Sequence, residues 1–198
     1  MIFTAISDYN HSMAKNLYII AGANGSGKTT LAHELLREEK DLVFLNADEI
    51  AREINDDLGL RAGKIVLERA DELLKAKKSV ALESTISGKY HERLIEKFKK
   101  SGYEIVLIYV FLNLPELNIA RIKNRVALGG HNVPDQDVIR RFHKSVKNFW
   151  AATGLADRWK LYYNGDDNYE QIAAGRDDVL EILNDDLYNR FKKGLKNG

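Results

Sequence analysis

Gly22-Ala23-Asn24-Gly25-Ser26-Gly27-Lys28-Thr29 reads G-x-x-x-x-G-K-[ST], the pattern of a phosphate-binding loop. Glycines let the backbone curl until successive N–H groups point inward at phosphate oxygens. The apolar run 17–21 predicts a strand before the loop, and the residues after it predict a helix whose N-terminus attracts anions. Lys28 would meet the β and γ phosphates, and Thr29 would offer a hydroxyl to Mg²⁺.

An incidental lysine in a glycine-rich turn is the alternative interpretation. The strand and helix on either side of the motif argue against it. The loop, extended by one residue to Thr30, therefore predicts a nucleoside triphosphate site, and we expect ATP with Mg²⁺ as its ligand.

Short apolar runs alternate with helical patterns along the chain. We expect strands at 17–21, 42–46, 80–83, 105–112 and 161–163. We expect helices at 29–38, 48–55, 62–77, 90–100, 115–128, 135–150 and 176–191. This alternation predicts parallel βαβ units. The expected fold class is α/β: a P-loop NTPase with a doubly wound, mostly parallel five-stranded sheet and a helical lid over about 115–150.

Composition limits the class of protein. The chain has 198 residues, of which 44% are hydrophobic and 30% charged, so we expect one domain over 13–198, with 1–12 a flexible tail. Thirty basic and 29 acidic residues give a net charge of +1, which disfavours nucleic acid as the main partner. The chain has no cysteine, which excludes disulfides and thiolate catalysis. No apolar run approaches the roughly 20 residues of a membrane span. We expect a cytoplasmic protein with no membrane partner.

Two carboxylates follow predicted strands. Asp48 comes after the second strand, and Glu83 ends the third. Ligands bind at the carboxyl ends of strands in open α/β sheets, so one carboxylate is a candidate base for an acceptor hydroxyl. The other would hold the acceptor or a Mg²⁺-bound water. Alternatively, Asp48 caps a helix and Glu83 is a surface charge. Ser84 and Thr85 would either cap the next turn or contact the acceptor.

Arginines flank a glycine-containing loop further along the chain. Arg121 and Arg125 share one helix face, and Arg140 and Arg141 lie on the next helix. Arginine suits the charge of a γ-phosphate, and such a loop suits a lid that excludes water. Only one of the adjacent pair is expected to face the site. His131 would contact a phosphate or stabilise the loop. A solvated basic face is the alternative interpretation.

Other classes of P-loop protein lack support. We find no Asn-Lys-x-Asp motif of switch GTPases and no Leu-Ser-Gly-Gly signature of transport ATPases. The strand-end carboxylates and basic lid favour a small-molecule kinase.

The chain resembles the zeta-toxin family of P-loop kinases, in particular the short bacterial members described as predicted ABC-type ATPases. The resemblance spans about 16–163. It is carried by Gly22 to Thr30, Asn46-Ala47-Asp48-Glu49-Ile50-Ala51, Glu83-Ser84-Thr85-Ile86-Ser87-Gly88, Arg125-Val126-Ala127-Leu128-Gly129-Gly130-His131-Asn132-Val133-Pro134 and Arg140-Arg141-Phe142.

This resemblance implies ATP-dependent phosphorylation of a hydroxyl, for example in UDP-N-acetylglucosamine, and a protein antitoxin as a candidate partner. Asp48 matches the family's base, Glu83 an acidic residue near the acceptor, Lys28 the phosphate-binding lysine and Arg125 a γ-phosphate arginine. Arg121 also resembles the lid arginine that lies against adenine in nucleoside monophosphate kinases. Two alternatives stay open: a toxin of a toxin–antitoxin pair, and a nucleotide-dependent ATPase or binding module without a small acceptor.

Overall fold

The computed structural model describes residues 15–39, 41–56, 60–165 and 168–194. The expected tail at 1–12 lies outside these ranges.

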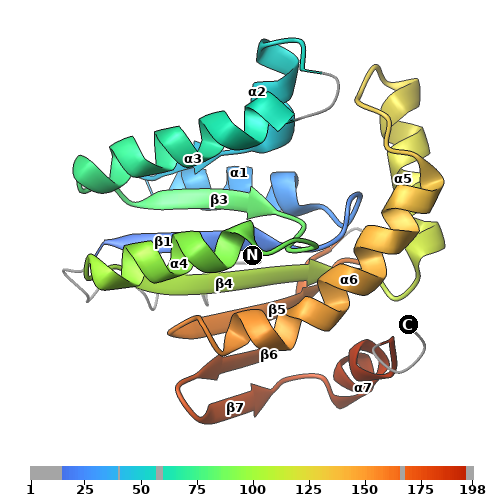
Figure 1. Ribbon diagram of the computed structural model, residues 1–198. Helices are drawn as coiled ribbons and strands as arrows, with labels where there is room; N and C mark the ends of the chain where they lie inside the picture. The colour runs from blue at the N-terminus through green and yellow to red at the C-terminus, as the bar shows by residue number, and fades with distance from the viewer. Residues whose placement is uncertain (1–14, 40, 57–59, 166–167, 195–198) are drawn as a thin grey trace.

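One seven-stranded sheet organises the described chain, in the order β2-β3-β1-β4-β5-β6-β7 (Figure 1). The strands are β1 (Asn16–Ala21), β2 (Val43–Leu45), β3 (Val80–Ser84), β4 (Glu104–Phe111), β5 (Arg158–Tyr163), β6 (Glu170–Arg176) and β7 (Val179–Ile182). The first five pair in parallel, and β6 and β7 add antiparallel strands at one edge. The mostly parallel α/β class is confirmed, with two strands more than predicted.

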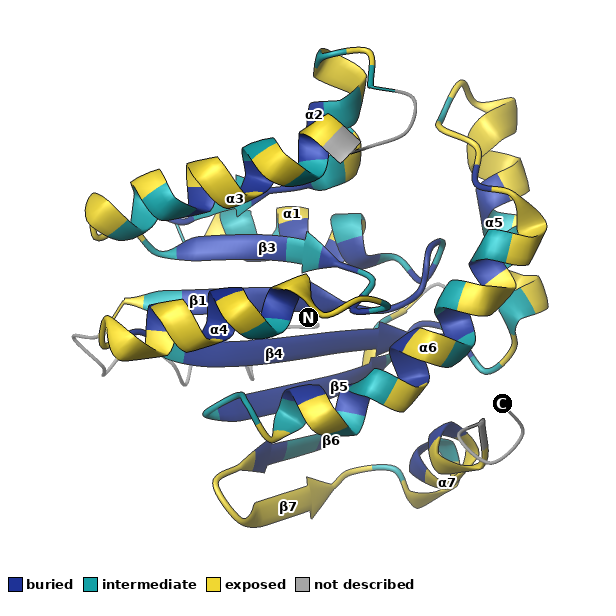
Figure 2. Ribbon diagram, viewed as in Figure 1, coloured by how far each residue is buried: buried dark blue, intermediate teal, exposed yellow. Residues whose placement is uncertain are grey.

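Helices cover both faces of the sheet. They are α1 (Lys28–Glu38), α2 (Ala47–Glu53), α3 (Leu60–Lys75), α4 (Tyr90–Lys100), α5 (Pro115–Ala127), α6 (Asp135–Thr153) and α7 (Asp185–Gly194). Successive strand residues point to opposite faces. Leu17 and Ile19 therefore belong to the core cluster that includes residues of α3, α4, α6 and α7, while Tyr18 and Ile20 belong to the cluster that includes residues of α1. Figure 2 shows the central strands buried between these layers.

The predicted helix at 176–191 is wrong. Arg176 ends β6, a turn at Asp177 (φ 51°) leads into β7, and only α7 is helical. The apolar spacing of this segment fits a helix as well as a strand, but pairing of β6 with β5 decides in favour of the strand. Asn184 then starts α7, because its side-chain oxygen accepts a hydrogen bond from the Leu187 N–H at 3.0 Å.

Strand order brings three strand ends together. β3 lies between β2 and β1, so the segments that follow these strands meet at one edge of the sheet. The phosphate loop follows β1, Asn46 follows β2, and the Glu83–Ser84 dipeptide ends β3. In the described part of the chain, no helix is long and apolar enough to cross a membrane.

Candidate functional site

The phosphate loop borders a cavity of about 500 Å³. Six of its residues line that cavity: Asn24, Gly25, Gly27, Lys28, Thr29 and Thr30. The other predicted binding residues of the loop, Gly22, Ala23 and Ser26, are buried behind this surface. Gly22 must be glycine here, because its φ is 141° and a Cβ would lie 2.1 Å from the Val110 carbonyl oxygen of β4.

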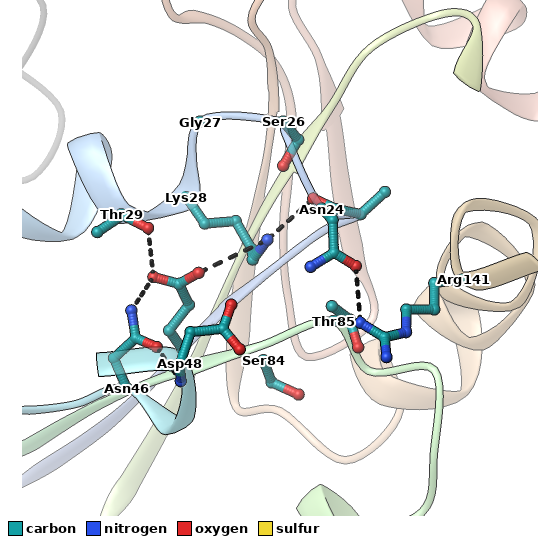
Figure 3. Close-up of polar contacts among 12 residues, drawn as sticks. Asn24, Ser26, Gly27, Lys28, Thr29, Asn46, Asp48, Ser84, Thr85 and Arg141 are labelled. Atoms are coloured by element: carbon teal, nitrogen blue, oxygen red, sulfur yellow. Dashed lines mark hydrogen bonds and ion pairs between the residues drawn. The ribbon is translucent and has the colours of Figure 1, made fainter. Parts of the chain in front are cut away.

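Glu83 is the polar centre of the site. One of its carboxylate oxygens accepts hydrogen bonds from the Thr29 hydroxyl (2.8 Å) and the Asn46 side-chain amide (3.0 Å). The other lies 3.7 Å from the Lys28 ammonium, and both side chains of this pair are less than 10% exposed. Figure 3 shows Lys28, Thr29, Asn46 and Asp48 directed into the same space beneath the loop. Glu83 therefore joins the predicted metal ligand to the predicted phosphate lysine.

Contacts within the phosphate loop and with Glu83 hold Lys28. Its ammonium donates to the Ala23 carbonyl at 2.9 Å, within the same loop. Burial lowers the pKa of Lys28, while the nearby carboxylates of Glu83 and Asp48 act in the opposite direction. A triphosphate entering the cavity would bring further negative charge to this buried cation.

Asp48 lies where the cavities meet. The N-cap of α2 is Asn46, whose side-chain oxygen accepts from the Asp48 N–H at 2.8 Å. The carboxylate of Asp48 is therefore not the cap of this helix, and it lines both the 500 Å³ cavity and a neighbouring cavity of about 600 Å³. Lys28 and Glu83 line both cavities as well.

The loop after β3 forms one wall of the second cavity. Ser84 Oγ accepts hydrogen bonds from the Ile86 N–H and the Tyr90 hydroxyl, both at 3.0 Å. Thr85 and Ser87 hydroxyls are 2.9 Å apart. All but Ile86 line this cavity. Ile86 has a φ of 43°, which is rare for a β-branched residue and indicates a strained turn. The predicted residues Ser84 and Thr85 thus border a polar cavity next to the loop.

The arginines of α5 and α6 are divided between the cavities. Arg121, Arg125 and His131 line the phosphate-loop cavity, and the Arg125 guanidinium donates to the His131 carbonyl at 2.9 Å. Arg141 donates to the Asn24 side-chain oxygen at 3.2 Å (Figure 3), whereas Arg140 pairs with Asp137 at 2.7 Å. Both of these arginines line the second cavity.

Three side chains from outside the phosphate loop donate hydrogen bonds to its carbonyls, and the sequence did not predict that they act together. Asn118 of α5 donates to the Asn24 carbonyl at 2.7 Å. Asn164 donates to the Ser26 carbonyl at 2.9 Å, and Tyr169 to the Gly27 carbonyl at 2.7 Å. A polar residue on the apolar face of the 115–128 helix was the available signal for Asn118. The position of Tyr169 depends on the pairing of β6, which the sequence did not reveal.

The residues present fit a magnesium ion bound with nucleotide. Thr29 directs its hydroxyl proton at Glu83, which leaves the oxygen lone pairs available to a cation. Hydroxyl and carboxylate oxygens are the ligands and water-holding groups that Mg²⁺ prefers.

The chain is similar to a known protein family and to a bacterial protein. A family model described as zeta toxin matches residues 2–174. An uncharacterised Haemophilus influenzae protein is 30% identical over 134 residues, covering 66% of this chain and 94% of that protein.

Two solved structures share the fold. The PezAT toxin–antitoxin system of Streptococcus pneumoniae matches with a TM-score of 0.61 at 16% identity, over 94% of this chain and 88% of that one. An AvrRxo1-ORF1:-ORF2 complex with ATP matches with a TM-score of 0.71 at 15% identity. The match covers 90% of this chain but only 63% of the AvrRxo1 chain.

Proposed function

The chain belongs to the zeta toxin family, and from that premise we propose that it is an ATP-dependent kinase that phosphorylates a hydroxyl of a small molecule. One observation carries the proposal. Asp48, Lys28 and Glu83 line both the phosphate-loop cavity and the adjoining polar cavity. A nucleotide in the first cavity and an acceptor in the second would therefore meet at these three side chains.

The transfer needs a base and positive charge. The acceptor oxygen attacks the γ-phosphorus, the bond from this phosphorus to the β–γ bridging oxygen breaks, and ADP leaves. Asp48 accepts the proton of the acceptor hydroxyl. Lys28, Arg125 and Arg141 offset the charge on the transferring group. When bound, Mg²⁺ would neutralise phosphate charge, and Thr29 and Glu83 are the residues that would hold it.

Arg141 is the better candidate for the γ-phosphate arginine of the adjacent pair. Its guanidinium reaches the Asn24 side chain of the phosphate loop, whereas the Arg140 guanidinium pairs with Asp137 of its own helix. We assign Arg140 to the acceptor. A cavity of about 600 Å³ lined by hydroxyl side chains and two arginines suits a polar, anionic acceptor. A UDP-amino sugar, with UDP-N-acetylglucosamine as the first compound to test, has this chemistry.

Two of the similar solved structures favour a second candidate, a toxin restrained by a protein antitoxin. One neighbour is a toxin–antitoxin system, and the other is a two-protein complex. Expression in bacteria tests this role. Growth arrest by the wild-type chain, lost in Lys28→Ala, would support a toxin. Normal growth at high expression would argue for a housekeeping kinase.

The kinase proposal is tested by separating transfer from nucleotide binding. Asp48→Asn should slow transfer about 10²- to 10⁴-fold, the usual contribution of a general base, and leave ATP affinity within about twofold. Glu49→Gln is the matched control, because Glu49 lies on the same helix turn but faces His33 at 4.0 Å. ADP release is followed with ATP, Mg²⁺ and UDP-N-acetylglucosamine or other hydroxyl compounds. Equal rates in the two variants would remove Asp48 as the base.

A further inference from the structure

Three side chains from outside the phosphate loop hold its carbonyl groups. The donors are Asn118, Asn164 and Tyr169, and the acceptors are the carbonyls of Asn24, Ser26 and Gly27. A peptide unit is planar, and its C=O and N–H point in opposite directions. Fixing these three carbonyls therefore also fixes the N–H groups of Gly25, Gly27 and Lys28.

Those N–H groups belong to the residues that line the nucleotide cavity. A loop of backbone donors binds phosphate well only if its peptide planes are already turned the right way, because turning them on binding costs conformational entropy. From this geometry we infer that Asn164 and Tyr169 are positioning residues for the triphosphate, acting through the carbonyls of Ser26 and Gly27. The inference rests on the proposed nucleotide site and adds residues to it.

The conformation of Gly27 supports this role. Its φ is 100°, and a Cβ there would lie 2.3 Å from the Asn164 amide nitrogen and 2.7 Å from the Tyr169 hydroxyl. The last glycine of the motif is therefore required both by its backbone and by the two donors packed against it. Glycine is the one residue that allows these donors to approach so closely.

Tyr169 is suited to be a permanent donor. Burial raises the pKa of its hydroxyl, so the group keeps its proton throughout the neutral range. Tyr169 also lines the cavity beside Asn164 and Thr30, and Arg121 of α5 lines it too. Asn164 and Tyr169, which follow β5 and precede β6, thus line the nucleotide cavity and also donate to carbonyls of the phosphate loop.

Tyr169→Phe tests the inference, since it removes the hydroxyl and keeps the ring. Tyr162→Phe is the matched control: it removes a hydroxyl bonded to Gln171 at 2.9 Å in the same strand pair. Affinity is measured by calorimetry for ATP and for inorganic tripolyphosphate, both with Mg²⁺. We expect Tyr169→Phe to weaken both ligands by roughly 3- to 10-fold, the size of one hydrogen bond, and the control to leave both unchanged.

The second variant is Asn164→Asp, which places an acceptor against the Ser26 carbonyl and should weaken both ligands further. ATP affinity that is unchanged in Tyr169→Phe would overturn the inference. So would a loss for ATP with none for tripolyphosphate, because the hydroxyl would then act on the nucleoside. A wild-type chain that does not bind ATP at all would overturn the proposed function itself.

Discussion

Replacing Glu83 by glutamine should uncouple nucleotide binding from magnesium. The substitution keeps the shape of the side chain and removes its charge. In the structure that charge accepts hydrogen bonds from Thr29 and Asn46 and lies 3.7 Å from the Lys28 ammonium. A glutamine has one acceptor oxygen, so its amide nitrogen must face either those donors or the lysine. The variant therefore lacks the negative charge beside Thr29, the candidate magnesium ligand, and its new amide N–H group faces another donor or the Lys28 ammonium.

The magnitude follows from the geometry. At 3.7 Å, the Lys28–Glu83 attraction is about 4 kcal/mol before desolvation is subtracted, for an effective dielectric constant of about 20. Because the amide can rearrange, we expect a net loss of only about 1–3 kcal/mol in the free energy of unfolding without nucleotide. Groups that hold a metal's ligands and waters typically contribute about 10- to 100-fold to its binding. The ratio of ATP affinities with and without Mg²⁺ should therefore fall by about that factor.

Calorimetric titration with ATP, in Mg²⁺ and in EDTA, measures this ratio. The metal-free affinity of Glu83→Gln should match or exceed that of the wild type, since a carboxylate no longer repels the phosphates. Glu104→Gln is the control: Glu104 is also partly buried and pairs with Arg158 at 3.0 Å, but it starts β4, away from the loop. A Mg²⁺ dependence that is unchanged in Glu83→Gln would refute the role given to this carboxylate.

Three further predictions concern the lid, the loop and a buried histidine. Arg141→Ala should lower kcat by about 10²-fold or more with little change in the acceptor KM, whereas Arg140→Ala should mainly raise that KM; the reverse pattern would exchange their roles. Gly27→Ala should abolish ATP binding detectable by calorimetry. Gly63→Ala, where a Cβ meets nothing within 4 Å, should preserve ATP binding and raise the free energy of unfolding in urea by about 0.5–1 kcal/mol, because alanine stabilises α3. Burial lowers the pKa of His91 below 6.5, so the unfolded chain binds a proton more readily than the folded chain does. The free energy of unfolding should therefore fall as the pH drops below 6.5, by up to about 1.4 kcal/mol per pH unit. Urea unfolding at several pH values should show this slope reduced in His91→Gln, and an identical slope would contradict the assignment.

The parallel part of the fold was predictable because its signals are local. Each of the first five strands contains a short apolar run, and the phosphate motif fixes the first strand, loop and helix together. The edge formed by β6 and β7 was not predictable in this way. Val179, Leu180 and Ile182 are spaced so that a helix would gather them on one face, yet they lie exposed on an edge strand. Antiparallel pairing of β6 with β5 and of β7 with β6, rather than the spacing of apolar residues, determines that segment.

The same division holds in the site. The sequence placed Lys28, Asp48 and Glu83 at strand ends, and parallel topology brings such ends together. It did not distinguish Arg140 from Arg141, since adjacent helical residues differ only in direction, and direction depends on how α6 packs. Nor did it identify Tyr169, which reaches Gly27 from 142 residues away along the chain. Contacts of this kind depend on β-sheet register, which the local sequence does not specify.

The most direct test of the central claim is ³¹P NMR of a reaction containing the protein, ATP, Mg²⁺ and one hydroxyl compound at a time, beginning with UDP-N-acetylglucosamine. We predict that one acceptor yields a new phosphate monoester together with ADP, and that both products require Lys28 and Asp48. Inorganic phosphate as the sole new product, formed at one rate with every acceptor and still formed by Asp48→Asn, would contradict the kinase account and favour an ATPase.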